Sequence, residues 1–385
     1  MQTHADDNGH FIFKNIPAGS YTLTVTLIGY EPLSSVIKVS KNNNTDIHLS
    51  LRVNSLQLQP VVVTAEKRES DLQAVPMAVS AISGRQIERR KITEVGDLLL
   101  SVPNLMTMND GAPSLSTIAI RGILTFSTDP AVGVYVDGVP MFDGYSSSLQ
   151  FQNLERIEVL RGPQSTLYGR NALGGIINII TRKPDNALHG FAEAGTGSYG
   201  SQRYALGLSG PIVKNKLFAG FTGLYDTRNG FYTNLYNSKK YDKPETWNGN
   251  AYLKYLVSDK FSLTLNAKGE YNNIRGAFPY VVNADSVFKH LYTINQNGAN
   301  LEKRKLYTAS LTAQYKTKST QFSSTTAYTY LSDTYEDYDA DYSPYNMVTF
   351  EMPLQKQKTF TQDFRMTGDY GKHIKLTAGI FGLID

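Results

Sequence analysis

The sequence predicts a mainly β protein with an α+β domain near its middle, and three observations support this. Residues 21–27 alternate between apolar residues and threonines, which is the pattern of a half-buried strand. Residues 154–184 contain two short apolar strands around a turn rich in glycine and proline. After Pro184 the chain consists of long strands in which apolar and polar residues alternate.

Residues 154–184 contain a strand, a short helical segment and a second strand. The β-prone run Ile157–Leu160 stops at a Gly-Pro pair, because proline has no backbone N–H for a sheet ladder. Gln164–Tyr168 then reads as one or two helical turns that a glycine ends. The run Gly175–Thr181 is apolar except for Asn178, as in a strand covered on both faces.

The strands after Pro184 have the pattern of a membrane-spanning β-barrel wall. Phe261–Lys268, Tyr307–Tyr315 and Phe360–Met366 alternate as a wall with lipid on one face and water on the other requires. Short turns also alternate with long polar connections at residues 229–245, 272–300 and 335–353, which is typical of periplasmic turns and external loops. We expect about nine strands from Leu188 onward.

Composition excludes several classes of protein. The 38 basic residues are interspersed with 34 acidic ones, and the net charge is only +4, which argues against nucleic-acid binding. The absence of cysteine excludes disulfides and thiolate metal sites. No run approaches the roughly 18 apolar residues of a membrane helix. The 25 tyrosines suit the aromatic girdles of a barrel.

Several ordered motifs resemble the plug signature of TonB-dependent outer-membrane receptors. They are Ile120-Arg121-Gly122, Val134-Tyr135-Val136-Asp137-Gly138-Val139-Pro140, Glu155-Arg156-Ile157-Glu158-Val159-Leu160-Arg161-Gly162-Pro163, Leu167-Tyr168-Gly169 and Gly174-Gly175-Ile176-Ile177-Asn178-Ile179. The resemblance covers roughly residues 58–385. It implies an α+β plug domain at residues 77–184 and the first part of a transmembrane antiparallel β-barrel at residues 185–385. It also implies an outer-membrane location, no enzymatic activity and no cofactor.

Residues 1–52 resemble a partial carboxypeptidase regulatory-like β-sandwich, a domain that precedes the plug in some of these receptors. The resemblance rests on the Gly-x-Phe-x-Phe pattern that begins at Gly9, on Pro17-Ala18-Gly19-Ser20-Tyr21 and on Ile28-Gly29-Tyr30. We expect strands at residues 11–13, at residues 36–38 and at residues 46–51 beside the one at residues 21–27. The domain's name implies no peptidase activity: the histidines at positions 4, 10 and 48 have no glutamate at metal-ligand spacing, so we expect neither catalytic nor metal-binding residues.

Residues 53–76 read as a linker, and its centre resembles the family's energy-coupling box. This box comprises Val61, Val62, Val63, Thr64 and Ala65, and three consecutive valines favour extended structure. The resemblance implies that the box lends its backbone as an added strand to the periplasmic domain of TonB. The alternative is an ordinary linker strand, or the last strand of the preceding sandwich.

The plug itself is expected to carry two further sets of functional residues. Capping-box spacing predicts a helix from Ser83 through Arg90, and a second helix is expected over Glu94–Leu100. By analogy with the family, polar connections form apical loops that contact ligand through Asn109, Asp110, Phe126, Phe142 and Tyr145. The resemblance also implies pairing of Arg121, Arg156 and Arg161 with barrel carboxylates, with ordinary surface arginines as the alternative.

One glycine-rich motif does not indicate a dinucleotide-binding site. Residues 195–200 match the GxGxxG dinucleotide fingerprint, which must open a helix whose amino terminus faces the pyrophosphate. Arg203–Ser209 alternates like a strand instead, so we expect a hairpin and no bound cofactor.

These features together indicate TonB-dependent active import of a scarce ligand across the outer membrane. The expected partners are TonB, outer-membrane lipid and a small ligand such as a ferric siderophore, without nucleic acid. Residues 160–172 look closer to siderophore-type plugs, and glycan or cobalamin import is the alternative. A passive porin or adhesin would need neither plug nor coupling box. Because about nine strands fall short of the family's 22 and no signal peptide is found, the chain reads as truncated at both ends, so a non-functional gene fragment is a third hypothesis.

Overall fold

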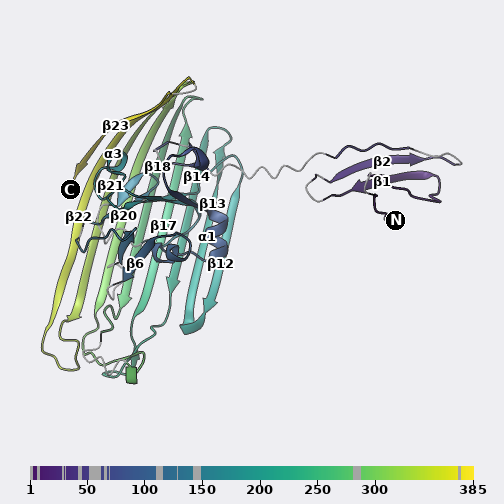
Figure 1. The fold of residues 1–385 in the computed structure, drawn as a ribbon. Coiled ribbons are helices and arrows are strands. Elements are labelled where there is room, and N and C mark those ends of the chain that lie inside the picture. The colour runs from purple at the N-terminus through teal and green to yellow at the C-terminus, as the bar shows by residue number, and fades with distance from the viewer. Residues whose placement is uncertain are drawn as a thin grey trace. The chain divides into compact units, whose positions relative to one another are not determined.

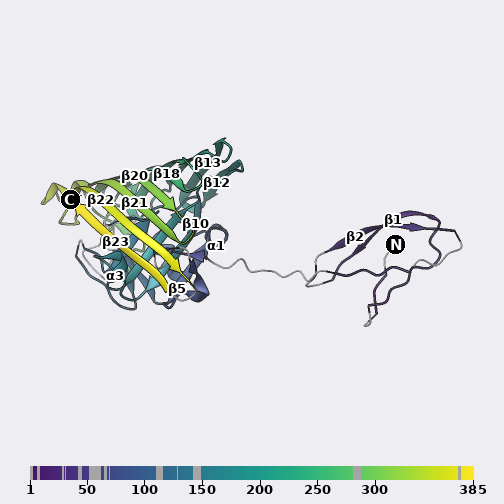
Figure 2. The same cartoon turned by 90° about the horizontal axis from the view of Figure 1, so that it is seen from above.

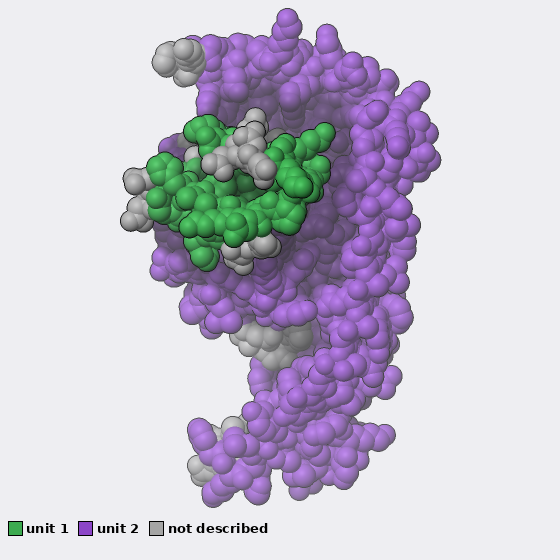
Figure 3. All heavy atoms as spheres, turned by 90° about the vertical axis from the view of Figure 1, so that its right-hand side faces the viewer, with its two compact units in different colours: residues 1–61 green, residues 62–385 purple. Residues whose placement is uncertain are grey.

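The computed structural model forms two compact units, residues 1–61 and residues 62–385 (Figure 3). It describes residues 3–6, 9–27, 30, 32–41, 46–51, 62–64, 67–68, 70–109, 116–127, 129–141, 149–280, 288–371 and 374–385. Among these residues, no helix has the length and apolar character needed to cross a membrane.

The first unit contains a single described β-hairpin. Strand β1 (Gly19–Val25) pairs antiparallel with β2 (Leu33–Val39), and Tyr21 lies opposite Ile37. Strands were also expected at residues 11–13 and 46–51, and this was wrong, because neither segment pairs with a neighbour there. The apolar side chains of this unit find little to pack against: Ile12 is 69% exposed and Val36 is 73% exposed.

A five-stranded sheet forms the centre of the plug. Its strands follow the order β5-β10-β11-β8-β9, with β10 antiparallel to both neighbours and β11 parallel to β8. Every residue of β11 is buried, as its continuous apolar run predicted. The bounds are β5 (Val79–Ser83), β8 (Val132–Val136), β9 (Val139–Met141), β10 (Leu154–Arg161) and β11 (Gly175–Thr181).

Short helices and hairpins surround this sheet. Helix α1 (Gly84–Arg90) begins after Ser83, whose backbone N–H donates to the Gln86 side chain at 2.9 Å, so the expected cap is present. The second expected helix is instead the 3₁₀ helix η2 (Val95–Leu100). The remaining elements are β3 (Val62–Val63), β4 (Ser70–Asp71), η1 (Leu72–Ala74), β6 (Leu105–Asn109), β7 (Ser116–Ile120) and α3 (Ser165–Tyr168).

The pairing of β10 with β11 depends on a glycine at its closed end. Gly175 has φ +151°, a conformation that side chains rarely adopt, and lies opposite Arg161. A Cβ atom at this position would lie 2.2 Å from the carbonyl oxygen of Leu160. Only glycine therefore lets the chain return into β11 so close to the end of β10.

Nine antiparallel strands form the large sheet, as the alternating sequence predicted. Some strands are longer than expected: pairing between β21 and β22 continues to Asp339 opposite Thr349, inside a segment expected to be a loop. The expected hairpin at residues 195–200 is present, with η3 (Ser198–Gly200) at its tip. The strands are β12 (His189–Gly197), β13 (Ser201–Val213), β14 (Leu217–Thr227), β17 (Lys243–Leu256), β18 (Phe261–Arg275), β20 (Leu301–Lys316), β21 (Thr320–Asp339), β22 (Thr349–Tyr370) and β23 (Ile374–Ile384). A small sheet on the long connections comprises β15 (Thr233–Asn234), β16 (Lys239–Lys240) and β19 (Thr293–Ile294).

The large sheet curves around the plug, as Figures 1 and 2 show from two directions. Leu306, Ala327 and Leu331 of β20 and β21 belong to the same buried apolar cluster as Ile157 and Ile177 of the plug. The inner face of the sheet is therefore a wall against which the plug packs. Its opposite face carries exposed apolar side chains, among them Leu206, Leu265, Leu311, Phe360 and Ile380.

Candidate functional site

The segment with the coupling-box resemblance is anchored to the plug. Strand β3 pairs antiparallel with β4, with Val62 opposite Asp71 and Val63 opposite Ser70. The Val63 side chain is fully buried in an apolar cluster that also contains Leu160 and Ile176 of the central sheet. Burial of this one side chain fixes the segment to the plug by a hydrophobic contact of about 1.5–3 kcal/mol.

Next to Val63, Thr64 is bound by a buried carboxylate. Glu158 lies in the middle of β10 with 0% exposure. Its Oε1 accepts the Thr64 backbone N–H at 2.8 Å, and its Oε2 accepts the Thr64 hydroxyl at 2.9 Å. Arg156 Nε donates to the same Oε1 at 2.8 Å and supplies the opposite charge. Hydrogen bonds to an ionised group are roughly twice as strong as neutral ones, so Glu158 is the main anchor of Thr64.

Neutral side chains complete this network. Asn178 of β11 donates from Nδ2 to the Thr64 hydroxyl at 2.8 Å and to Glu158 Oε2 at 3.2 Å. The Tyr168 hydroxyl donates to the Thr64 carbonyl at 3.3 Å, and the Tyr135 hydroxyl donates to the Tyr168 carbonyl at 2.7 Å. Burial raises the pKa of both tyrosines, so they remain neutral donors. Both backbone polar groups of Thr64 are thus hydrogen-bonded to plug side chains.

Beyond Thr64 the segment also contacts the wall. Lys67 Nζ lies 3.3 Å from Asp363 Oδ2 of β22, and 5.0 Å from the centre of the Tyr168 ring. Burial lowers the pKa of Lys67, the nearby charge of Arg365 lowers it further, and Asp363 opposes both. Arg365 Nη1 donates to the Lys67 carbonyl at 3.3 Å. Arg68 Nη1 lies 2.8 Å from Asp369 Oδ1. The segment therefore bridges the plug and the wall.

A second attachment joins the plug to the wall at the turn between β8 and β9. Asp137 accepts the Thr181 backbone N–H at 2.9 Å and the Thr181 hydroxyl at 2.7 Å, and it forms an ion pair with Lys268 of β18. Burial by itself would raise the pKa of Asp137. The charge of Lys268 and these hydrogen bonds outweigh that effect and hold the pKa below its ordinary value.

A third attachment lies just before β10. Glu270 Oε2 accepts the Gln150 backbone N–H at 3.1 Å, and Gln152 Nε2 donates to Asn248 Oδ1 at 2.6 Å. Arg203 Nη2 donates to the Phe151 carbonyl at 2.8 Å. Each contact joins the plug to a different wall strand, so this short plug segment is held by β13, β17 and β18 together.

Only some of the predicted coupling and ligand residues lie in the part of the chain that the structure describes. Val62 and Val63 form β3, and Thr64 is bound as above. Asn109 ends β6, and Phe126 is 74% exposed. Val61, Ala65, Asp110, Phe142 and Tyr145 lie outside the described residues.

The three predicted arginines are not the ones that join plug and wall in the described chain. Both ion pairs of Arg156 are with plug carboxylates, Glu155 and Glu158. Arg121 is exposed in a left-handed turn at φ 55°, and its backbone N–H donates to the Asn104 carbonyl at 2.8 Å. Arg161 has a buried Nε without a hydrogen-bond partner among the described residues. Among the described residues, ion pairs across the interface are formed instead by Lys67, Arg68, Lys91, Asp137 and Arg170.

The sequence did contain a signal for the residues that were missed. Glu158 and Asn178 are polar residues inside the two apolar runs that the pattern assigned to buried strands. A buried charge is expensive unless it is paired, so a glutamate in such a run calls for partners nearby. No local pattern names those partners, and Thr64 is 94 residues away in the chain.

Comparison with known proteins identifies both units. Residues 71–176 match the TonB-dependent receptor plug domain, and residues 1–63 match the CarboxypepD_reg-like domain. Residues 71–176 are therefore a TonB-dependent receptor plug domain, preceded by a CarboxypepD_reg-like domain. TonB-dependent receptors are transporters rather than enzymes, and the outer membrane is their location. The predictions of these two domains, of a mainly β fold with plug and barrel wall, and of outer-membrane location are confirmed.

Two curated receptors illustrate the similarity. The pesticin receptor of Yersinia pestis is 37% identical over 174 residues, which is 44% of this chain and 26% of that protein. The iron-regulated outer membrane virulence protein of Vibrio cholerae serotype O1 is 36% identical over 148 residues, 36% of this chain and 22% of that protein. The aligned part of this chain thus spans about a quarter of the length of these relatives.

Solved receptors share the fold over most of the chain. The ferric yersiniabactin uptake receptor FyuA from Yersinia pestis has a TM-score of 0.73 at 25% identity, covering 80% of this chain and 48% of that one. The ferripyoverdine receptor of Pseudomonas aeruginosa has a TM-score of 0.66 at 16% identity, covering 84% of this chain and 44% of that one. The chain therefore spans about half the length of these two structures.

We predict that Glu158→Gln loosens Thr64 without unfolding the plug. The amide cannot pair with Arg156 as a charge, and it has only one acceptor oxygen for Thr64. A loss of about 3 kcal/mol should speed exchange of the Thr64 backbone N–H roughly 100-fold, measured by hydrogen exchange. Glu155→Gln is the matched control, because that side chain is 44% exposed. Unchanged protection of Thr64 in Glu158→Gln would contradict the assignment of Glu158 as its anchor.

We also predict that Asp137 stabilises the receptor only above acidic pH. Because its folded pKa is below the unfolded value of about 3.9, its contribution is present above about pH 4 and is lost as the pH falls through the folded pKa. Asp137→Asn should lower the free energy of unfolding by about 2 kcal/mol at pH 7 and by progressively less below pH 4, measured by urea titration. The exposed Glu88→Gln serves as control, and a difference independent of pH would refute the prediction.

Proposed function

We propose that this chain acts in TonB-dependent active import of a scarce ligand across the outer membrane. In this proposal TonB pairs with Val61–Ala65, and the pull opens a path past the plug. The observation that carries the proposal is the anchoring of Thr64 to Glu158, because it ties an extended segment directly to the central sheet of the plug. A segment that only links two domains would not need hydrogen bonds to a buried carboxylate of the plug.

The geometry supports transmission of force into the plug. A pull on Val62 and Val63 reaches β10 through the two hydrogen bonds of Thr64 to Glu158. β10 lies between β5 and β11, so a displacement of β10 disturbs pairing on both of its sides. This route leads from the coupling segment to β5, β10 and β11 of the plug sheet.

The Arg68–Asp369 contact with β22 is weaker and would yield first. The Asp369 side chain is 66% exposed, and ion pairs exposed to solvent contribute about 0–1 kcal/mol. The bonds of Glu158 are fully buried and charge-assisted, and they hold longer under load. In this proposal Arg68 leaves the wall first, while Thr64 remains attached to the plug.

For the ligand we propose a ferric siderophore. The structurally similar proteins include a ferric yersiniabactin uptake receptor and a ferripyoverdine receptor. Ligand contacts are proposed at Asn109, Asp110, Phe126, Phe142 and Tyr145, in the apical connections of the plug. The exposed ring of Phe126 supports this, because an aromatic side chain that packs in no core is available to a ligand.

We predict that proline at position 62 separates binding from uptake. Val62→Pro deletes one N–H and fixes φ, so an added TonB strand loses a ladder bond worth about 1 kcal/mol net at the centre of a short interface. Energised uptake by the full-length receptor should fail, whereas ligand affinity at the outer face stays within about twofold of wild type. Val62→Ala keeps the backbone and should transport nearly normally. Normal uptake by Val62→Pro, or equal loss of binding, would mean that the segment is only a linker.

A parallel measurement tests the ligand site. Phe126→Ala in the full-length receptor should weaken ferric siderophore binding by about 1–3 kcal/mol, about 5-fold to 150-fold in Kd, if the ring contacts the ligand. Val36→Ala, equally exposed but in the other unit, is the control. Titration with a glycan and with cobalamin in place of the siderophore tests the alternatives. Unchanged affinity for all three ligand classes would remove Phe126 from the site.

A further inference from the structure

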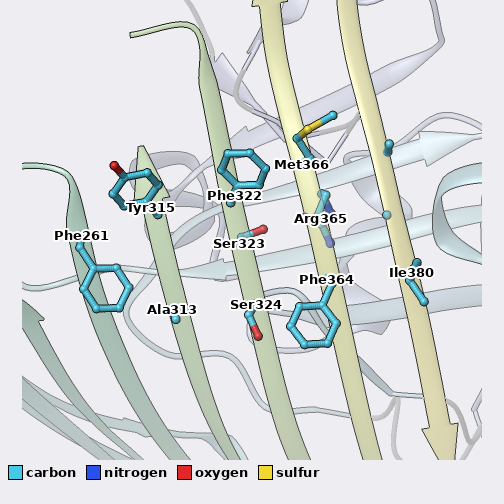
Figure 4. Close-up of a pocket in the computed structure, with 12 residues that line it drawn as sticks. Phe261, Ala313, Tyr315, Phe322, Ser323, Ser324, Phe364, Arg365, Met366 and Ile380 are labelled. Atoms are coloured by element: carbon cyan, nitrogen blue, oxygen red, sulfur yellow. The ribbon is translucent and has the colours of Figure 1, made fainter. Parts of the chain in front are cut away.

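The outer face of the large sheet has an apolar groove close to the short turns. Figure 4 shows the rings of Phe261, Tyr315, Phe322 and Phe364 on neighbouring strands, together with Ile380 of β23. Ala313, Met366, Ala378 and Gly379 also line the groove, and so do Ser323, Ser324 and Arg365. Apolar residues therefore predominate in the lining, which spans five strands, β18 and β20 to β23.

Strand register places these side chains on one face. Phe261 lies opposite Tyr315, Tyr315 opposite Phe322, and Phe322 opposite Met366. Directly opposed residues of antiparallel strands point to the same side of a sheet. Phe364 and Ile380 form a second row, two residues further from the turns. The groove thus runs from the turns toward the middle of the sheet.

Exposed lysines lie at the turn end of this groove. Lys260 immediately precedes Phe261, and Lys316 immediately follows Tyr315. The Lys316 N–H donates to the Lys260 carbonyl at 2.8 Å, so the two residues are neighbours, and Lys318 lies in the same turn as Lys316. None of the three forms an ion pair with a described residue. Asp259 is the acidic residue in these two turns.

The lysines continue along the same rim of the sheet. Lys214 and Lys216 are exposed in the turn between β13 and β14, and Lys375 is exposed at the start of β23. Asp369, which lies opposite Lys375, is already engaged by Arg68. This end of the wall is therefore a basic rim with apolar aromatic side chains directly beside it.

We propose that the groove and the basic rim form a binding site for one anionic phospholipid of the inner leaflet. An acyl chain lies against Phe322 and Phe364, and the phosphate lies at Lys260, Lys316 and Lys318. Each lysine near an anionic headgroup contributes about a fivefold gain in affinity. The exposed Tyr315 ring is placed where an aromatic side chain meets the headgroup level.

A lipid fits this surface better than a protein partner does. Four of the five strands that line the groove, β18 and β20 to β22, are paired on both sides, so their backbone offers no free edge to an added strand. An apolar groove that ends at cationic groups matches one acyl chain and the anionic headgroup of a phospholipid. The proposal rests on the membrane location of the wall and is independent of TonB coupling.

The test is lipid binding to the purified full chain in detergent, followed by native mass spectrometry. Phosphatidylglycerol and phosphatidylcholine with identical acyl chains serve as the probes. Wild type should retain phosphatidylglycerol at least tenfold more tightly than phosphatidylcholine. The triple variant Lys260→Gln, Lys316→Gln, Lys318→Gln should lose this preference, with phosphatidylglycerol affinity falling about 100-fold.

Matched variants keep this test decisive. Lys239→Gln, Lys240→Gln, Lys303→Gln, on long connections and a distant strand end, should leave both affinities unchanged. Phe322→Ser with Phe364→Ser should weaken both lipids about equally, because the acyl chain is common to them. Equal binding of the two lipids by wild type would overturn the proposal. Inorganic phosphate that displaces phosphatidylglycerol completely at millimolar concentration would also overturn it, since the site would then bind phosphate without an acyl chain.

Discussion

A buried carboxylate is the constraint on which the rest of this structure depends. Glu158 lies fully buried at the centre of the plug sheet, where an unpaired charge would cost several kcal/mol. Its two oxygens are satisfied by Arg156, Asn178 and Thr64, and only the first two belong to the sheet itself. The third partner must come from the segment before the plug. The requirement to satisfy one charge therefore fixes the position of the coupling segment.

The contacts between plug and wall are mostly polar and directional. A few apolar residues, Leu306, Ala327 and Leu331, join the plug core, whereas Asp137, Gln150 and the coupling segment use ion pairs and hydrogen bonds. Polar contacts can exchange partners with water at little net cost, because the net value of each is only about 1 kcal/mol. Water could not replace the contacts of an apolar interface of the same area in this way. This composition suits a plug that is held firmly at rest and yet can shift within its wall.

The same wall strands serve two environments because side chains alternate along them. On β22, Asp363, Arg365 and Asp369 face inward and bind the coupling segment. Phe364 and Met366, between them in sequence, line the groove on the outer face (Figure 4). A shift of one residue in register would reverse both assignments at once. Plug attachment and lipid contact are thus fixed by a single register.

The sequence by itself determined the elements whose causes are local. The buried run of β11, the Ser83 cap of α1, the Gly197 hairpin and the alternating wall strands follow from periodicity and turn chemistry over a few residues. The motifs also determined the plug domain. Only the tertiary structure decided which groups meet: Thr64 binds Glu158 across 94 residues, and Lys67 binds Asp363 across 296. It also lengthened β21 and β22 into expected loops and left residues 11–13 without a strand. The physical reason is that pairing and charge neutralisation depend on partners brought together by the fold, and no local pattern records them.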